Sequence, residues 1–194
     1  MALYWAACAL VAWRAGYWAE LASPPPARAS PPWATLLGVL AAAVPQPFYF
    51  RAVGRASAAA RPARSWPGIA LFACANGLLE SFAFRAVRDA GVAAARVLAP
   101  PGRAPGGTTS FLAGLAALSL YCGLIHALFW ERVFPPHLPP PGAASARRDM
   151  HAALVLFLPM TAAFAALDLR AMVAAHVLAD AAAAAALRLP PPWA

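Results

Sequence analysis

Charged side chains are scarce in this chain of 194 residues: they make up 11% of it, whereas 62% of the residues are hydrophobic. Soluble domains carry charge on roughly a quarter of their residues, so this composition argues strongly against a soluble enzyme. Lysine is absent: all 15 basic residues are arginine, against 7 acidic residues, for a net charge of +8. Because these arginines stand mainly between long apolar stretches, they indicate membrane topology, and no nucleic-acid partner is expected.

Cysteine is also rare, and its spacing excludes two further classes. Cys8, Cys74 and Cys122 all lie inside apolar segments and form no CxxC pair, so neither a disulfide framework nor a zinc ribbon is expected. The HExxH motif of zinc proteases is absent as well. No cofactor is therefore predicted, although the histidines together with Glu80 leave room for a divalent metal such as zinc.

What the chain does contain is six stretches close to the length of a membrane helix, about 17–25 apolar residues. They are residues 2–18, 33–50, 66–84, 110–130, 151–167 and 171–187. Segments rich in proline, glycine, serine or arginine separate the first five, and residues 168–170 separate the last two. Since backbone amides in hydrocarbon must be bonded within the chain, each stretch is predicted to be a helix. The predicted fold is all-α, a polytopic transmembrane bundle of about six helices in contact with a lipid bilayer.

Details of the stretches refine this topology. Pro45 and Pro47 should kink the second helix. The third should continue beyond Phe84 towards Val97, because no proline intervenes. The first begins at Ala2 without a basic segment, so an anchor is expected and not a cleaved signal. Arginine counts favour both termini in the cytosol or stroma. The chain is predicted to be a multi-pass integral membrane protein. Its membrane could be that of a plastid, the ER or the plasma membrane of a bacterium.

Ionisable side chains inside these apolar stretches need an explanation, because each costs at least about 2.5–3.5 kcal/mol to insert. The four that stand out are Glu80, His126, His176 and Asp180. If their helices meet, two carboxylates and two imidazoles can activate water and stabilise an oxyanion. His176 and Asp180 are four residues apart and so share one helix face.

Each of these residues also has a structural interpretation. An intramembrane histidine can simply hydrogen-bond a neighbouring helix. Glu80 can pair with Arg85 or Arg88 at the membrane edge, and Asp180 with an arginine of another helix. Taken together, in order and at these spacings, the four residues favour a common site.

These residues resemble the motifs of the CPBP/ABI family, which includes CAAX prenyl proteases, bacteriocin-processing enzymes and Ras-converting endopeptidases. The family pattern EExxxR corresponds to residues 80–85 (ESFAFR), FxxxH to 122–126 (CGLIH) and HxxxN or HxxxD to 176–180 (HVLAD). Two positions depart from the pattern. Ser81 replaces the second glutamate and would be a supporting residue, and Cys122 replaces the aromatic.

The resemblance implies an intramembrane endopeptidase domain at 66–187, preceded by N-terminal membrane helices and a basic loop at 1–65 and followed by a short tail at 188–194. Glu80 and His126 would activate the hydrolytic water. His176 and Asp180 would form the oxyanion site or hold the substrate carbonyl, and Arg85 would support the site. The implied substrate is a membrane-associated protein or peptide, and prenyl-directed members of the family remove the last three residues of CAAX proteins.

Two other classes of function fit the same residues. One is a catalytically inactive membrane scaffold of the same fold, which Ser81 favours. The other is a small proton-coupled transporter, because intramembrane glutamate, histidine and aspartate also mark proton paths. A transporter needs these groups strung across the bilayer, whereas a hydrolase needs them clustered.

Overall fold

The computed structural model describes residues 2–24, 30–48, 65–100, 102, 104–124 and 153–187, and all regular structure in these residues is helical. The prediction of an all-α fold is confirmed. Two of the described helices, α5 (Trp66–Leu98) and α6 (Gly107–Leu124), are long and apolar enough to cross a membrane. They give limited support to a membrane protein, and a bundle of six spanning helices stays a prediction.

Helix α5 is the longest element, with 33 residues, or about 50 Å at 1.5 Å per residue. Its start is capped by Ser65, whose hydroxyl accepts a hydrogen bond from the backbone N–H of Gly68 at 3.3 Å. The helix continues past Phe84 and ends at Leu98, close to the predicted Val97. It is longer than a bilayer core requires, and charged residues concentrate in its second half.

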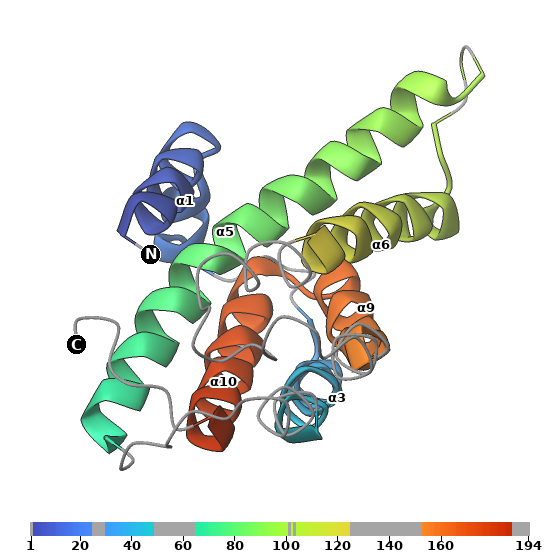
Figure 1. Ribbon diagram of the computed structural model, residues 1–194. Helices are drawn as coiled ribbons and strands as arrows, with labels where there is room; N and C mark the ends of the chain where they lie inside the picture. The colour runs from blue at the N-terminus through green and yellow to red at the C-terminus, as the bar shows by residue number, and fades with distance from the viewer. Residues whose placement is uncertain are drawn as a thin grey trace, which may run out of the picture.

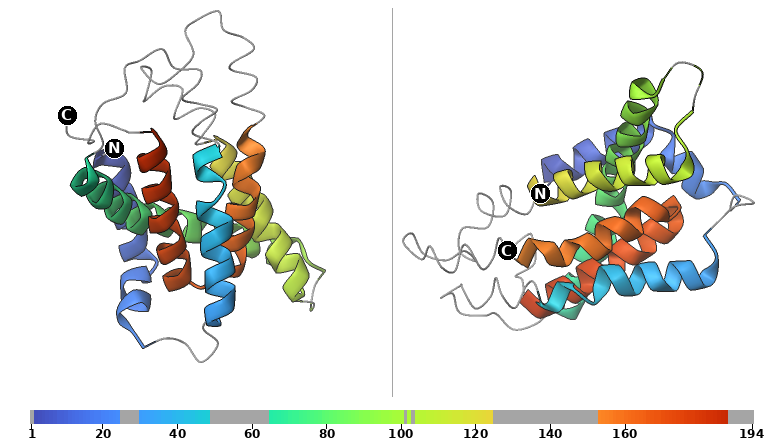
Figure 2. Two further views of the ribbon diagram at one scale, coloured as in Figure 1. Left: turned by 90° about the horizontal axis from the view of Figure 1, so that it is seen from below. Right: turned by 90° about the vertical axis from the view of Figure 1, so that its right-hand side faces the viewer.

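The other helices pack around α5 (Figure 1). Helix α6 runs back beside its second half, while α10 (Leu169–Leu187) packs against its first half. Helix α1 (Ala2–Arg14) lies on the opposite side of α5, and α3 (Pro32–Ala43) contacts α10. Figure 2 shows α5 crossing α3 and α10, which lie alongside each other. This crossing brings the middle of α5 over the centre of the molecule.

The first two predicted stretches differ in detail from the structure. The stretch 2–18 is not one helix: α1 ends at Arg14, and α2 (Tyr17–Ala22) begins after Gly16, whose φ of 74° is left-handed. Glycine adopts that conformation at little cost, so it permits a break that hydropathy alone does not reveal. Helix α3 ends at Ala43, residues 44 and 45 form a bend, and residues 46–48 are helical again, so the prolines interrupt the helix as predicted.

The last two stretches meet at a capped turn. Residues 151–167 contain the short 3-10 helix η3 (Ala153–Phe157) followed by α9 (Leu158–Ala166). Asp168 then caps α10, because its carboxylate accepts the backbone N–H groups of Arg170 at 3.0 Å and Ala171 at 3.1 Å. The same carboxylate accepts the N–H of Ser30 at 2.7 Å, and the Ser30 hydroxyl accepts the N–H of Asp168 at 3.1 Å. These bonds fasten residue 30 to the start of α10.

This capping is reflected in the acidity of Asp168. Partial burial raises the pKa of its carboxyl, but hydrogen bonds from Ser30, Ala171 and Arg170 outweigh that effect, so the pKa lies below the ordinary value. Arg170 also donates to the carbonyls of Glu20 and Leu21 at 2.8 and 3.0 Å and to that of Ser23. The end of α2 and the start of α10 are thereby held together.

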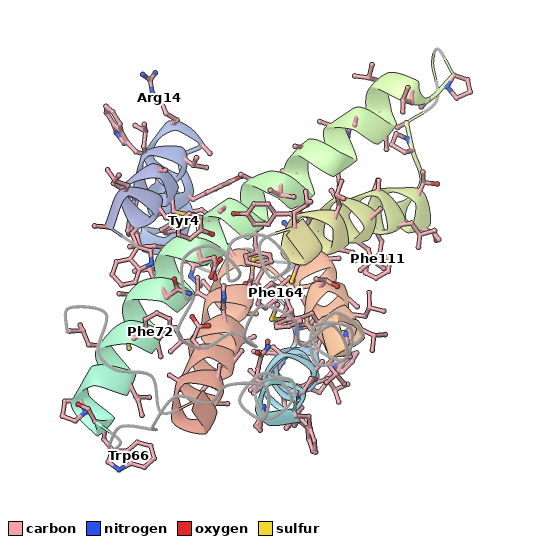
Figure 3. All side chains as sticks on the ribbon, in the orientation of Figure 1. Tyr4, Arg14, Trp66, Phe72, Phe111 and Phe164 are labelled. Atoms are coloured by element: carbon pink, nitrogen blue, oxygen red, sulfur yellow. The ribbon has the colours of Figure 1, made fainter. Side chains whose placement is uncertain are left out.

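Helices α5 and α10 lie in close contact at Gly77. A Cβ atom at this position would lie 2.7 Å from both the Cα and the backbone nitrogen of Val177, so only glycine fits without a shift of one helix. Nearby, the ring of Phe164 is fully buried and points from α9 into the centre where α5, α6 and α10 meet (Figure 3). Gly77 therefore determines how close the polar residues of the two helices can come.

Candidate functional site

A polar cluster lies where one face of α5 meets one face of α10. Asn76 and Glu80 are four residues apart on α5, and His176 and Asp180 are four apart on α10, so each pair shares a helix face. We call these four residues the site cluster. Because Gly77 has no side chain, the two helix faces can approach each other closely there.

The ionisable members of the site cluster are within direct reach of one another. The Nε2 atom of His176 lies 3.5 Å from Oε2 of Glu80 and 3.8 Å from Oδ1 of Asp180. The side chain of His176 is 4% exposed, and those of Glu80 and Asp180 are 12% and 16% exposed. Two carboxylates and an imidazole are thus largely buried together, and their electrostatic interactions are stronger there than in water.

Asn76 connects the two carboxylates. Its Nδ2 atom donates to Oε2 of Glu80 at 2.7 Å and to Oδ2 of Asp180 at 2.9 Å. Its Oδ1 atom accepts the indole N–H of Trp5 at 2.8 Å. Asn76 is the only asparagine in the chain and is 4% exposed. Both polar atoms of its buried amide are therefore hydrogen-bonded.

Helix α1 supplies a second hydrogen bond to the site. The hydroxyl of Tyr4 donates to Oε1 of Glu80 at 2.7 Å, so each oxygen of that carboxylate accepts a hydrogen bond. The Tyr4 oxygen also lies 3.0 Å from the hydroxyl of Tyr121 on α6. Figure 3 shows Tyr4 between α1 and α5. The site is therefore built from α1, α5, α6 and α10.

The other edge of the His176 ring faces Ser81. The Ser81 hydroxyl lies 2.5 Å from the carbonyl oxygen of Gly77, which only accepts, so the hydroxyl donates its one proton there. Its oxygen, 3.1 Å from Nδ1 of His176, must then accept from Nδ1–H. The aromatic rings of Phe84 and Phe164 lie against the imidazole, each with its centroid 5.2 Å away. His176 is thus fixed in position, with Nε2 turned towards the carboxylates.

The structure brings Glu80, His176 and Asp180 together, as the predicted convergence of helices requires. His126 lies outside the described residues, so its place in the site stays a prediction. Ser81 contacts the site directly, in keeping with a supporting position. The catalytic roles assigned to these residues also stay predictions.

Arg85 occupies a different cluster. Its guanidinium lies 3.4 Å from Glu20 and 2.8 Å from Asp89, while Arg88 lies 3.3 Å from Asp89. We call Glu20, Arg85, Arg88 and Asp89 the ionic cluster. Its arginines pair with Glu20 and Asp89, so the alternative in which the membrane-edge arginines serve as ion-pair partners of Glu80 gains no support here. The predicted support of the site by Arg85 would be indirect, through the second half of α5.

Three contributors to the site were missed in the sequence: Tyr4, Trp5 and Asn76. Asn76 carries a usable signal, because it precedes Glu80 by four residues and therefore shares its helix face. Tyr4 and Trp5 carry none, since they reach residues more than 70 positions away along the chain. Only the packing of α1 on α5 reveals them.

The site also offers a partial set of metal ligands. One atom each from Glu80, His176 and Asp180 lies within 4.8 Å of the other two. Carboxylate oxygen and imidazole nitrogen are ligands that zinc accepts, usually four in number with water. Asn76 and Tyr4 already donate to these carboxylates, whose remaining lone pairs can accept a proton or a hydrogen bond from water instead of binding a metal.

An apolar cavity of about 320 Å³ lies between α6, η3 and α9. It is lined by Ser119, Cys122, Gly123, Val155, Phe157, Leu158 and Thr161. Cys122 stands at the first position of the segment that resembles the FxxxH motif, so the cavity borders the helix leading to His126.

Comparison of the chain with protein-family models, with curated proteins and with solved structures finds no match.

Proposed function

We propose that this chain is a membrane-embedded endopeptidase that hydrolyses a peptide bond of a membrane-associated protein. In this proposal about six helices cross the membrane, and Glu80 together with His126 activates the attacking water. The observation that carries the proposal is the convergence of Glu80, His176 and Asp180, whose ligand atoms lie within 4.8 Å of one another. Ionisable groups buried together at such separations are typical of catalytic sites.

Exposed apolar side chains support a membrane environment. Leu3, Trp33, Leu71 and Leu120 are each more than half exposed, and they lie on four different helices. They belong to a larger set of exposed large hydrophobic side chains, and extensive apolar surface is typical of contact with a membrane or another protein. The apolar lengths of α5 and α6 point in the same direction.

The proposed reaction needs one acid–base group next to water and one group next to the carbonyl oxygen. The oxygen of a water molecule attacks the carbonyl carbon while one water proton passes to the Glu80 carboxylate. The carbon–nitrogen bond then breaks, and the same proton passes from Glu80 to the leaving nitrogen. The hydrogen bonds from Tyr4 and Asn76 orient both oxygens of Glu80 for this exchange.

His176 and Asp180 would serve the carbonyl side of the reaction. In its doubly protonated form, His176 presents Nε2–H towards the volume between the two carboxylates, where an oxyanion can accept it. Ser81, bonded to Nδ1, keeps the ring from turning away. Asp180, 3.8 Å from Nε2, stabilises that protonated form.

Clustering favours this proposal over a proton-coupled transporter, which needs its ionisable groups distributed across the bilayer. A non-catalytic scaffold of the same fold is the second candidate. It is favoured by Ser81, which replaces an acid of the family pattern. Ser81 is fully buried, and its hydroxyl is hydrogen-bonded to Gly77 and His176.

The deciding experiment is peptide hydrolysis by the purified chain in lipid nanodiscs. Fluorescence-quenched peptides that end in a CAAX sequence, with and without a prenyl group, and a third set of internal membrane-proximal peptides provide the substrates. Glu80→Gln should lower hydrolysis by about 100-fold or more, because it removes the proton acceptor while preserving shape.

The matched control is Glu20→Gln, which makes the same chemical change in the ionic cluster and should leave the rate within about threefold. Unchanged hydrolysis in Glu80→Gln would refute the proposal. Absence of hydrolysis in the parent chain with all three peptide sets would favour the scaffold.

A further inference from the structure

We propose that Asn76 is the positioning residue that holds Glu80 and Asp180 at one reaction centre, and that Trp5 of α1 fixes the direction of its amide. This inference rests on the proposed endopeptidase function and names residues outside the three motifs that suggested it. It also makes α1, which lies outside the motif-bearing region 66–187, a part of the site.

The orientation of the Asn76 amide follows from its partners. An indole N–H can only donate, so the atom of Asn76 that lies 2.8 Å from Nε1 of Trp5 must be the carbonyl oxygen. The amide nitrogen then faces Glu80 and Asp180, which as carboxylates only accept. Turning the amide over would put an oxygen against two carboxylates and a nitrogen against an N–H.

The position of the two carboxylates relative to each other depends on this amide. Glu80 and Asp180 come from different helices, and like charges at such separations repel strongly where water is excluded. The Asn76 nitrogen carries two protons, one for each carboxylate, at 2.7 and 2.9 Å. It therefore offsets the repulsion without adding an ion pair that would neutralise either acid.

Trp5 is the residue that prevents the side-chain amide of Asn76 from rotating. Its ring packs against Phe72 of α5, with the ring centroids 6.4 Å apart, so the indole remains in place through packing as well as through its hydrogen bond. Tyr4, the preceding residue, donates to the other oxygen of Glu80. Two consecutive residues of α1 thus hold both ends of the Glu80–Asn76 pair.

The activity test compares three site variants with one control. Asn76→Ala should lower kcat by about 10- to 100-fold, the loss expected for two hydrogen bonds to charged groups. Asn76→Asp keeps the shape but replaces the donor by a third carboxylate, so its kcat should be as low or lower. Trp5→Phe should lower kcat by about fivefold to tenfold, because the ring remains and only the N–H is lost.

In each site variant KM should change by less than about threefold, since a positioning residue acts on Glu80 and Asp180 and not on substrate binding. The control, Trp18→Phe, removes an indole N–H that donates to the carbonyl of Ala9 at 3.4 Å, away from the site, and should leave kcat unchanged. Parent-like kcat in Asn76→Asp would mean that the residue only fills space and would overturn the proposal. Equal kcat in Trp5→Phe and Trp18→Phe would overturn the role of Trp5.

A measurement without substrate separates this inference from the proposed function. Nuclear magnetic resonance of nitrogen-15 tryptophan-labelled protein resolves the indole N–H groups of the 7 tryptophans, and Trp5→Phe identifies the signal of Trp5. In Asn76→Ala this signal should shift and lose its protection from deuterium exchange, while the Trp18 signal should not. A Trp5 signal that does not move in Asn76→Ala overturns the inference whatever the activity. If the signal shifts in Asn76→Ala but the parent chain hydrolyses no peptide, only the endopeptidase function is overturned.

Discussion

The two polar clusters along α5 contain the same kinds of acid but different partners. In the ionic cluster, two arginines lie against two carboxylates, so the formal charges sum to zero. In the site cluster, Glu80 and Asp180 accept hydrogen bonds from the neutral amide of Asn76 and lie beside one histidine. The formal charge of its four residues is −2 when the histidine is neutral.

The difference indicates which cluster stabilises the fold and which is suited to chemistry. Arginine–carboxylate pairs on the second half of α5 neutralise charge and bond the carbonyls of Phe164 and Leu167 through Arg88. Asn76 and Tyr4 are neutral donors, and even a doubly protonated His176 leaves a formal charge of −1 in the site cluster, so its carboxylates keep the capacity to accept a proton. Maintaining charge in a buried volume has a free-energy cost, which a functional role explains and packing alone does not.

The largest expected effect comes from making the same substitution, aspartate to asparagine, in each of the two clusters. Asp180→Asn should lower the rate of peptide hydrolysis by about 100-fold or more, because Nε2 of His176 loses the carboxylate 3.8 Å away. Asp89→Asn should change that rate by less than about threefold while lowering the melting temperature, since Asp89 pairs with Arg85 and accepts the Tyr17 hydroxyl at 3.2 Å. Equal rates in the two variants would remove the distinction between the clusters.

The helix contact beneath the site cluster should be the next most sensitive position. Gly77→Ala is expected to reduce the free energy of unfolding by about 2–3 kcal/mol, because the added methyl group meets the backbone of Val177 at 2.7 Å. Gly123→Ala on α6 is the control, since a Cβ there meets nothing within 4 Å. Denaturation in detergent micelles measures both, and equal stability in the two variants would contradict the close contact of α5 with α10.

A substitution in the ionic cluster should affect stability without affecting catalysis. Arg88→Met is expected to lower the free energy of unfolding by about 2 kcal/mol, because it removes the donor 2.6 Å from the carbonyl oxygen of Leu167. The control is Arg96→Met in the exposed last turn of α5, where no measurable change in stability is expected. If hydrolysis per folded molecule fell in Arg88→Met, the ionic cluster would have a direct part in the reaction.

The smallest expected effect concerns Asp168, whose carboxylate caps α10 and lies outside both the site cluster and the ionic cluster. Its depressed pKa means that the charged form stabilises the fold above the ordinary pKa of aspartate, about 4, and that this contribution is lost as the pH falls further. Asp168→Ala should cost about 1 kcal/mol at neutral pH, the usual cost of losing a helix cap. The difference between parent and variant should shrink in unfolding measured at pH 3, and a constant difference would contradict the charged cap.

Much of the helical fold follows from the sequence, and its deviations have local causes. The extent of α5 to Leu98 follows from the absence of proline before Pro100. The break after Arg14 does not follow from hydropathy, because it depends on the left-handed backbone of Gly16. The interruption of α3 after Ala43 follows from Pro45, and the chain is helical again at residues 46–48.

The candidate site is only partly visible in the sequence. The spacing of His176 and Asp180 places both on one face of α10, and insertion cost identifies Glu80 as unusual. Their meeting depends on Gly77, whose role becomes clear only when Val177 lies against it. The contributions of α1 are long-range contacts, and no local pattern in the chain encodes them.

The most direct test of the central claim is a double-mutant cycle between Glu80→Gln and Asp180→Asn, measured as kcat/KM for the peptide that the parent chain cleaves best. If the two carboxylates act on the same reacting atoms, the double variant should be hardly slower than the slower single variant, as for groups that work as a unit. Losses that multiply, so that the double variant shows the product of the two single effects, would contradict a common reaction centre.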